Sequence, residues 1–428
     1  MDYTQALKEL ESRKESRMIP DLSRILALAT YLDDPQLSYP TIHVTGTNGK
    51  GTAARVASEI ACAHGLTTGL YTSPHLERVT ERLSVCGVDM TEQEFADEFT
   101  HLHPFLDLVD GQSDERVTYF EALTALAYLW FADRPVALGV FEVGMGGTWD
   151  ATNLVGGDIA VITPIGLDHP ELGSTLTEVA GEKAGIIKDG KVAVVREQEA
   201  EALTVLEQRA AKVGATVLLE FRDWEVVERL HAVGGQAFSV QGTRAGYDEL
   251  FLPVLGEHAV RNAAAAIVAC EELFGEPLDD DALRSALAGV RWPGRLEVAG
   301  RHPTIVLDGA HNPAGAEALA SALREFFPAE RLHLVVSISA NKDVAGIAAR
   351  LGPLADVVHA TRNESERSAD PTAIRVAFTD RGAPVTEHAS VADALEAARA
   401  SASADDLICV TGSLYTVADA RRALGLTI

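Results

Sequence analysis

The sequence predicts an α/β protein with two domains. The first is a P-loop-type domain with a mostly parallel sheet and a small antiparallel appendage, and the second is a smaller Rossmann-like α/β domain. Short apolar runs alternate with amphipathic helical stretches, which is the pattern of a parallel sheet covered by helices. A glycine-rich segment at 46–52 follows an apolar run and precedes a helical stretch. The 428 residues also exceed the size of most single hydrophobic cores.

The first series of elements fills the N-terminal half. Runs typical of strands are TIHV (41–44), GLYTS (69–73), VALGVFEVG (136–144), DIAVITP (158–164) and VAVV (192–195). Residues 53–65 and 120–132 have the periodicity of helices, and Gly65 is placed to end the first of them. The charged N-terminal segment 1–17 also predicts a helix.

The organisation changes near residue 293, where a Trp-Pro-Gly turn interrupts the helix-rich stretch. A second alternating series follows, with strand-like runs at 304–310, 332–338 and 406–412. We therefore expect domains at 1–293 and 294–428. The segment 225–256 differs from both, because its successive strand-like runs are joined by Gly turns, and it predicts the antiparallel appendage.

Composition limits the partners and the setting. The formal net charge of −27 opposes binding to nucleic acid, because a phosphate polymer requires basic patches. Neither an apolar run long enough for a membrane span nor a signal peptide is found, so we expect a cytoplasmic protein. The four cysteines are far apart without a CxxC pair, which predicts reduced thiols, with neither a zinc site nor a disulfide framework.

The segment TIHVTGTNGKGT (41–52) has the elements of a phosphate-binding loop in a shortened form. Two residues instead of four separate Gly46 from the Gly49-Lys50 pair, and Gly51 stands between Lys50 and Thr52. A loop between a strand and a helix directs backbone N–H groups and the helix dipole at an anion. Lys50 would neutralise the terminal phosphates, and the Thr52 hydroxyl would face Mg²⁺. The alternative is a Gly-rich turn with an exposed lysine.

At this point the sequence resembles a known family, folylpolyglutamate synthase and dihydrofolate synthase, within the Mur ligase superfamily. The motifs that carry the resemblance run in order from Ile42 to residue 419: HVTGTNGKGT (43–52), TSPHL (72–76), TYFEALT (118–124), FEVGMGGTWDATN (141–153), LDHPELG (167–173), GEKAGIIK (181–188), WPGRLE (292–297), LDGAHNP (307–313) and TGSLYTVAD (411–419). The resemblance implies ATP-dependent amide formation, in which a substrate carboxylate is phosphorylated and the acyl phosphate is attacked by the amino group of L-glutamate. Dihydropteroate would accept the first glutamate, and reduced folates the later γ-linked ones.

The resemblance also implies site residues in the first domain. Expected ATP contacts there are Asn48, Gly49, Lys50, Gly51, Thr52 and Asn262. Mg²⁺, for which two ions are expected, would be bound by Thr52, Ser73, Glu142, His169 and Lys183. Hydroxyl and carboxylate oxygens at the ends of strands suit this hard cation. Three of these side chains also have a structural explanation that involves no metal. Ser73 could form a turn, Glu142 could pair with an arginine, and His169 could be a loop histidine that hydrogen-bonds to the backbone.

Lys183 presents a conflict, because an ammonium would be repelled by Mg²⁺. The family resolves it by carbamylating this lysine, which converts the cation into a carboxylate that supports a second metal. A helix beginning with a capping box at Thr175 and Glu178 would instead make Lys183 an ordinary surface lysine.

TYFE (118–121) has two compatible interpretations. Thr118 and Glu121 have the spacing of a capping box ahead of an apolar helix. The resemblance places Thr118, Tyr119, Phe120, Glu121 and Thr148 in the folate or pteroate pocket, where the aromatic rings could stack on the substrate. Two departures concern this pocket. Thr148 stands where some bifunctional members have Arg, and IPDLSRI (19–25) differs from the usual form, so synthesis of folylpolyglutamate alone is an alternative.

The second domain is expected to complete the ATP site. Arg295 and Asp308 match family positions that contact ATP, and His311, beside them, is a candidate catalytic residue. An ordinary reading of DGAHNP is a strand followed by an Asx and Pro helix start. Closure of the two domains would keep water from the acyl phosphate. The expected enzyme is a monomer whose partners are ATP, L-glutamate, and dihydropteroate or reduced folates.

Two rival functions account for part of the pattern. A P-loop switch or regulatory ATPase explains the loop and the metal ligands, but it leaves TYFE and the second domain unassigned. A cell-wall Mur ligase with a UDP-linked substrate expects an N-terminal domain for the UDP group, and only about forty residues precede the loop.

Overall fold

The computed structural model describes residues 1–14 and 20–426. Their contacts divide the chain into two compact units. The N-terminal unit comprises Met1–His231, Ala237–Phe251 and Arg261–Val290, and the C-terminal unit comprises Ala232–Gln236, Leu252–Val260 and Arg291–Ile428. None of the described helices has both the length and the apolar character that crossing a bilayer demands.

The N-terminal unit is built on an eight-stranded sheet. Its strands lie in the order β4 (Val88–Asp89), β3 (Leu83–Val85), β2 (Thr68–Tyr71), β5 (Leu138–Glu142), β1 (Thr41–Thr45), β6 (Ile159–Ile162), β7 (Val192–Val195) and β8 (Thr216–Leu219). All neighbouring pairs are parallel except β2 with β3 and β3 with β4. The parallel sheet that the sequence predicts is therefore confirmed, and each of its five expected strands is present.

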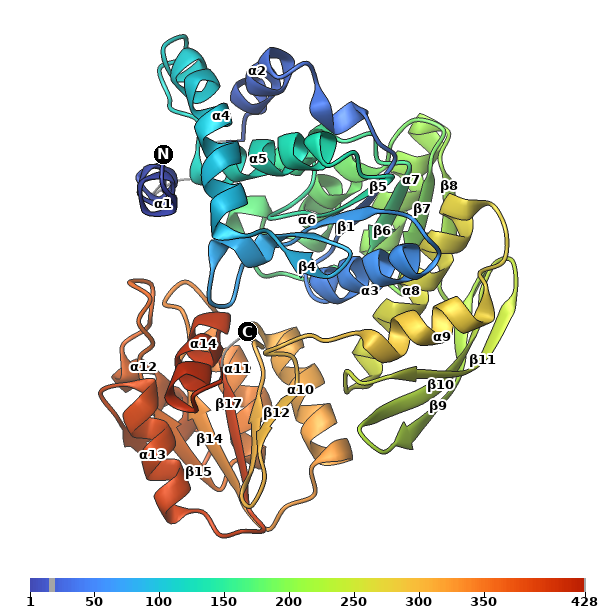
Figure 1. Cartoon of the computed structure of the whole chain (residues 1–428). Coiled ribbons are helices and arrows are strands. Elements are labelled where there is room, and N and C mark those ends of the chain that lie inside the picture. The colour runs from blue at the N-terminus through green and yellow to red at the C-terminus, as the bar shows by residue number, and fades with distance from the viewer. Residues whose placement is uncertain (15–19, 427–428) are drawn as a thin grey trace. The chain divides into compact units, whose positions relative to one another are not determined.

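Helices surround this sheet, as Figure 1 shows, and some of them, such as α1 and α2, pack on other helices. They are α1 (Tyr3–Glu11), α2 (Ser23–Tyr31), α3 (Lys50–Ala63), α4 (Glu92–Asp110), α5 (Tyr119–Asp133), α6 (Leu176–Lys183), α7 (Ala200–Val213), α8 (Glu257–Phe274) and α9 (Asp280–Gly289). The expected helix over 1–17 is observed as α1, and residues 15–17, like Ile19 of IPDLSRI, lie outside the described residues. Helix α3 begins three residues before the expected start, because the loop glycines lead directly into it.

The core explains why α5 carries so many apolar residues. Its capping box at Thr118 and Glu121 begins a helix with eleven buried residues. Tyr128 and Phe131 of α5 pack their rings against Phe141 of β5, at centroid distances of 5.5 and 5.6 Å. Such buried aromatic contacts hold α5 against β5.

The segment 225–256 forms a separate three-stranded sheet. Its strands β9 (Glu225–Ala232), β10 (Gly235–Gln241) and β11 (Gly246–Leu252) lie in the order β11-β10-β9, so strands that follow each other in the chain are neighbours. This is the small appendage that the Gly turns predict.

The C-terminal unit has a six-stranded sheet in the order β12 (Glu297–Gly300), β13 (Thr304–Leu307), β17 (Leu407–Thr411), β14 (Leu332–Val336), β15 (Val357–Ala360) and β16 (Val385–Glu387). Only β12 pairs in the antiparallel direction. The helices that accompany it are α10 (Pro313–Phe326), α11 (Val344–Leu351), α12 (Pro371–Thr379), α13 (Val391–Ser401) and α14 (Leu414–Ala423). The second α/β fold is thus confirmed.

The expectation of four reduced thiols is wrong for two of them, because Cys62 and Cys86 form a disulfide. Cys62 lies near the end of α3, and the chain then returns along β2 and its antiparallel neighbour β3, which ends beside Cys86. A separation of 24 residues in sequence therefore becomes a Cα–Cα distance of 5.6 Å. Cys270 and Cys409 are free thiols, as expected, and both are buried.

Candidate active site

The glycine-rich loop connects the end of β1 to the start of α3, and its glycines are required by space as well as by conformation. Gly46 has φ +144°, and a Cβ there would lie 1.8 Å from Thr163 Oγ1. Gly49 has φ +91°, and a Cβ there would lie 2.3 Å from Asn262 Nδ2. Any side chain at either position would be strained and would displace its neighbour. The loop is therefore held closely between β6 and α8.

The loop brings the Lys50 ammonium close to the backbone N–H groups at the start of α3. Gly49 caps α3, so Lys50, Gly51 and Thr52 form the first turn of a fourteen-residue helix. The first N–H groups of a helix lack partners within it and favour an anion. The Lys50 ammonium folds back over the loop and donates to the carbonyl oxygens of Gly46, at 3.2 Å, and Thr47, at 3.4 Å. This geometry supports the phosphate-binding interpretation over a turn with an exposed lysine.

Lys183 reaches the same loop from the last turn of α6. The capping box at Thr175 and Glu178 is present, as the sequence predicts. The surface position that an ordinary helical lysine would take is not observed, because Lys183 is only 3% exposed. Its Nζ donates to the carbonyl oxygen of Gly46 at 2.8 Å. Burial, followed by the charge of Lys50, lowers the pKa of Lys183 to about 7, against the opposing effect of Asp168 and Asp150.

A pocket of about 270 Å³, counting space open to solvent, lies beside this loop. Lys50, Lys183, Asp168 and His169 are among the residues that line it, together with glycines of the two loops that follow β1 and β5. His169 Nε2 lies 3.4 Å from an Asp168 carboxylate oxygen. Two lysines, a carboxylate and an imidazole therefore line the same cavity.

Of the other expected metal ligands, the structure brings Ser73 and Glu142 together. The Ser73 N–H donates to Glu142 Oε2 at 3.0 Å, because β2 and β5 are adjacent parallel strands that end at the same edge. Glu142 and Thr52 are buried, at 5% and 8% exposure. Within the described residues, neither Glu142 nor His169 belongs to a group of three Asp, Glu, His or Cys ligands within 4.8 Å. Mg²⁺ commonly binds one or two carboxylates and completes its shell with water and phosphate oxygens, so this oxygen-rich donor set fits the ion.

Asn262, on α8, lies against Gly49 of the loop. Its Oδ1 accepts a hydrogen bond from Arg196 Nη1, and Arg196 Nε donates in turn to Glu220 at 3.0 Å. All three side chains are buried. This chain of contacts fixes the amide of Asn262 beside the phosphate-binding loop, at the position where an ATP contact is expected.

The TYFE segment (118–121) caps α5 and also forms a buried ion pair. Glu121 Oε2 accepts the Thr118 N–H at 2.8 Å, and Glu121 N–H donates to Thr118 Oγ1 at 3.1 Å. Glu121 Oε2 also accepts from Arg24 Nε at 3.0 Å, and both side chains of this pair are buried. The Glu121 carboxylate therefore works as helix cap and as counter-charge, which leaves the two aromatic residues to face elsewhere.

Tyr119 and Phe120 point to different neighbours. The ring of Phe120 lies 6.1 Å from that of Tyr71, and a Cβ at Gly144 would lie 2.5 Å from it. The Arg82 guanidinium lies 5.6 Å from the Tyr119 ring centroid, and the Lys14 ammonium lies 5.7 Å from it. Phe120 thus borders the loop after β5, whereas Tyr119 belongs to a cationic cluster.

Thr148, the remaining expected pocket residue, is tied to the end of α6. Its backbone N–H and its Oγ1 both donate to the carbonyl oxygen of Glu182, at 2.8 and 3.0 Å. A Cβ at Gly185 would lie 2.3 Å from the same Oγ1. Thr148 therefore connects the loop after β5 to the helix that carries Lys183.

In the C-terminal unit, three expected residues gather in the loops around the end of β13. Asp308 is 8% exposed and accepts the N–H groups of Leu296, at 3.0 Å, and Ala310, at 2.9 Å. A Cβ at Gly309 would lie 2.6 Å from Arg295 Nη1. His311 Nδ1 lies 2.9 Å from the Gly309 carbonyl oxygen.

The helix start expected after these residues is also present. Asn312 caps α10, and Pro313 is its first residue. The ordinary reading of DGAHNP is thus confirmed, and it is compatible with a site.

Several residues at the site were not singled out in the sequence. Asp168 precedes His169 in the motif LDHPELG (167–173). An acidic residue next to a histidine is a local pattern that could have identified it as a site residue. Arg82 and His75 form a pair in which Arg82 Nε donates to His75 Nδ1 at 2.9 Å. Burial, then Arg82 and Lys14, lowers the pKa of His75 to about 3, so it is a neutral acceptor. Arg24 gave no local signal, because its partner Glu121 is 97 residues away.

Comparisons with known proteins first define the class. Residues 44–270 match the model of the Mur ligase middle domain, and residues 294–414 match that of the Mur ligase glutamate ligase domain. A phosphate-binding loop on a parallel sheet, followed by a second α/β unit, is therefore the architecture of an ATP-dependent ligase of the Mur type.

Individual relatives then specify the family. The chain is 40% identical to a dihydrofolate synthase/folylpolyglutamate synthase of Mycobacterium tuberculosis, over 96% of this chain and 91% of the relative. A solved structure of M. tuberculosis folylpolyglutamate synthase complexed with ADP has a TM-score of 0.96 and 39% identity, covering 99% of this chain and 98% of that one. E. coli FolC in complex with DHPP and ADP has a TM-score of 0.90 and 30% identity, covering 99% and 98%. The chain belongs to the folylpolyglutamate synthase/dihydrofolate synthase family and is an ATP-dependent ligase.

Proposed function

We propose that this enzyme joins L-glutamate to dihydropteroate and, through γ-linkages, to reduced folates. A substrate carboxylate oxygen attacks the γ-phosphorus of ATP, and ADP leaves. The glutamate amino nitrogen then attacks the acyl carbon, loses its proton, and displaces inorganic phosphate as the amide forms. The observation that supports this most directly is the convergence of Lys50, Lys183 and the loop residues Gly46 and Thr47 on one small pocket, in a chain whose relatives are named for these two activities.

The residues around the loop have distinct proposed roles. Two anions must approach each other in the first step, so charge that develops on the phosphoryl oxygens needs neutralisation. Lys50 supplies a cation there, and the N–H groups of Asn48, Gly49, Gly51 and Thr52 bind phosphate oxygens. Mg²⁺, held through Thr52, Ser73, Glu142 and His169, would supply further neutralisation when bound.

Lys183 is proposed to be carbamylated in the active enzyme. The neutral amine attacks CO₂, a C–N bond forms, and one proton is released, so the product is an N-carboxylate that keeps one N–H on Nζ. That remaining N–H can still donate to the Gly46 carbonyl oxygen, which Nζ already contacts at 2.8 Å. The carboxylate would then extend into the pocket, where it could serve as a ligand to a second Mg²⁺.

The other proposed roles concern nucleotide and substrate binding. Asn262, Arg295 and Asp308 are proposed to contact ATP, with His311 as a catalytic residue of the C-terminal unit. Tyr119 and Phe120 would contact the pteroate rings, next to Thr118 and Glu121. We retain 1–293 and 294–428 as the proposed functional domains, and we propose that the enzyme acts as a monomer in the cytoplasm.

One observation favours the narrower function, in which only folylpolyglutamates are made. The backbone N–H and the hydroxyl of Thr148 both donate to the Glu182 carbonyl oxygen. Thr148 therefore does not replace the cationic side chain that some bifunctional members have at this position. Acceptance of dihydropteroate would then depend on other groups, and Arg82, whose guanidinium lies 5.6 Å from the Tyr119 ring centroid, is one candidate cation.

The deciding experiment measures ADP release with L-glutamate and one of three acceptors: dihydropteroate, dihydrofolate or a reduced one-carbon folate. We expect release with dihydropteroate and with the reduced folate, each dependent on glutamate. Release with the reduced folate alone would restrict the enzyme to polyglutamylation. ADP release that needs neither glutamate nor a folate would reject the ligase assignment in favour of a regulatory ATPase.

A further inference from the structure

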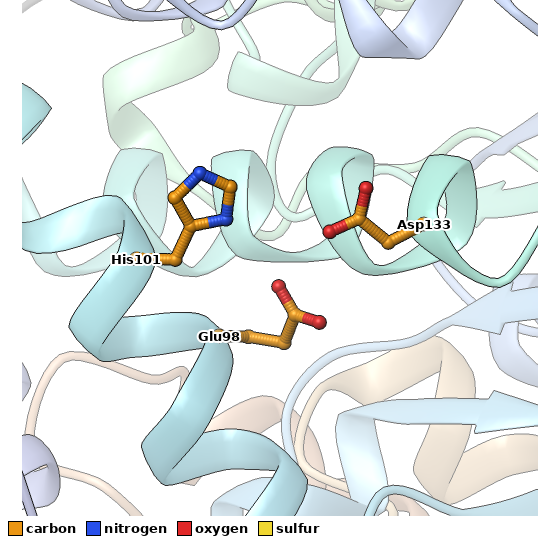
Figure 2. Close-up of side chains that lie close together, drawn as sticks. All are labelled: Glu98, His101 and Asp133. Carbon is orange, nitrogen blue, oxygen red and sulfur yellow. The ribbon is translucent and has the colours of Figure 1, made fainter.

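A second cluster of candidate ligand atoms lies on the packed pair α4 and α5. Glu98 and His101 are three residues apart on α4, so they share one face of that helix. Asp133 is the last residue of α5. Figure 2 shows the carboxylates of Glu98 and Asp133 and the ring of His101 facing a common space. Because α5 is fifteen residues long, Asp133 lies about 20 Å along the helix from Tyr119, the first residue of α5.

The distances are close to those of a coordinated ion. One ligand atom from each of the three residues lies within 4.8 Å of the other two. Ligands bound at about 2.0–2.2 Å to one ion can be separated by no more than about 4.4 Å. The cluster would therefore need only small side-chain rotations to hold an ion, and two of its members are exposed enough to make them.

The environment of Glu98 suits a cation. Glu98 Oε2 is buried and has no hydrogen-bond partner among the described residues. A buried carboxylate oxygen without a partner is costly unless a donor or a cation satisfies it. A divalent cation between the three side chains would satisfy this oxygen and offset the mutual repulsion of the Glu98 and Asp133 carboxylates.

We propose that Glu98, His101 and Asp133 form a site for a divalent transition metal, with Zn²⁺ as the probe that fits best. One imidazole nitrogen with two carboxylate oxygens is a mixed donor set that suits Zn²⁺, and the imidazole disfavours Mg²⁺ and Ca²⁺. Three protein ligands leave a position for water. The metal would join the end of α5 to the middle of α4, so its role is to stabilise this helix pair, apart from the chemistry at the nucleotide loop.

The test uses the full chain, stripped of metal by a chelator and dialysed, with excess Mg²⁺ present to occupy sites that prefer it. Zn²⁺ binding is measured by calorimetry, and Co²⁺ is used as a spectroscopic substitute whose absorption reports coordination by nitrogen and oxygen. The variants are Glu98→Gln, His101→Gln and Asp133→Asn. Matched controls are His103→Gln and Asp97→Asn, which lie on the same helix but outside the cluster.

We expect the wild type and both controls to bind one more Zn²⁺ than the three cluster variants do, or to bind it at least about tenfold more tightly. Zn²⁺ should also raise the Tm of the wild type by more than that of the cluster variants, because a ligand that binds only the folded state stabilises it. Equal Zn²⁺ stoichiometry and affinity in wild type and cluster variants would overturn the proposal. Glutamate-dependent ADP release with Mg²⁺ should be unchanged in the cluster variants, so failure here leaves the proposed ligase function standing.

Discussion

Lys50 and Lys183 donate hydrogen bonds to the same acceptor, the carbonyl oxygen of Gly46, at 3.2 and 2.8 Å. They come from different helices and are 133 positions apart in the chain. Burial first, and then the charge of Lys50, lowers the pKa of Lys183. Two ammonium groups around one carbonyl repel each other, so loss of one proton or an anion between them is favourable. Both conditions suit the proposed phosphate site and the proposed carbamylation of Lys183.

Lys50→Ala should lower the rate of ADP release by roughly 10²–10³-fold, because it removes a cation that stabilises the transferred phosphoryl group. The fold should be intact, since Lys50 is partly exposed and donates to carbonyl oxygens of its own loop. Rates and thermal unfolding are compared with Lys191→Ala, which removes a surface lysine paired with Asp158. Near-normal turnover in Lys50→Ala would reject the nucleotide assignment.

Lys183→Ala should lose most activity, by roughly 10²-fold, and a short carboxylate such as acetate should restore part of it by occupying the vacated position. The wild type should gain activity when bicarbonate is added to CO₂-depleted enzyme. The lowered pKa of Lys183 supports this, because near pH 7 a substantial fraction of the amine is neutral and can react with CO₂. An unmodified Lys183 in crystals grown with ATP and Mg²⁺ at neutral pH, together with no acetate rescue, would contradict carbamylation.

Glu121→Ala should destabilise the N-terminal unit by about 3 kcal/mol, because it removes the buried counter-charge of Arg24 and leaves only the more distant and exposed Asp21, at 3.7 Å. The matched control is Glu94→Ala, at the equivalent position of the capping box that begins α4, where the ion pair with Arg134 is more exposed. Loss of that cap should cost only about 1 kcal/mol. Urea unfolding of both variants gives the comparison, and equal losses would show that the Arg24 pair contributes little.

The Cys62–Cys86 disulfide should leave two titratable thiols, not four, in the denatured and unreduced protein. Reduction should lower the free energy of unfolding by about 3 kcal/mol, because the bond closes a loop of moderate length in the unfolded chain. Cys62→Ala provides the control, since its stability should not respond to a reducing agent. Four thiols in the unreduced protein would show that the bond does not form.

Stability of the C-terminal unit should fall as the pH drops below about 6.5. Burial, then the neighbouring charges of His388 and His333, lowers the pKa of His359 to about 4. Because this folded-state pKa lies below the unfolded value of about 6.5, the stabilisation is complete above 6.5 and is lost as the pH falls towards 4. Calorimetry of His359→Gln should show a weaker acid dependence than the wild type or His231→Gln. An identical pH profile in all three would contradict this assignment.

The sequence predicts the strands, the loop and the capping boxes well, because these depend on local periodicity and on residues three or four apart. It did not predict the burial of Lys183, since a lysine in the last turn of an amphipathic helix is usually exposed. The disulfide and the Arg24–Glu121 pair were missed for a different reason. Each joins residues that only the tertiary fold brings together, and the sequence around one partner does not indicate which residue the other partner is.

The contact between Gly49 and Asn262 also has a consequence for how the protein matures. The phosphate-binding loop is synthesised early, within the first 52 residues, but the side chain that lies against it arrives 213 positions after Gly49, on α8. Domains generally fold as units while the chain emerges from the ribosome. A nascent chain that ends before α8 would therefore carry a complete nucleotide motif without the wall that confines it, and it should bind nucleotide weakly until that helix has been made.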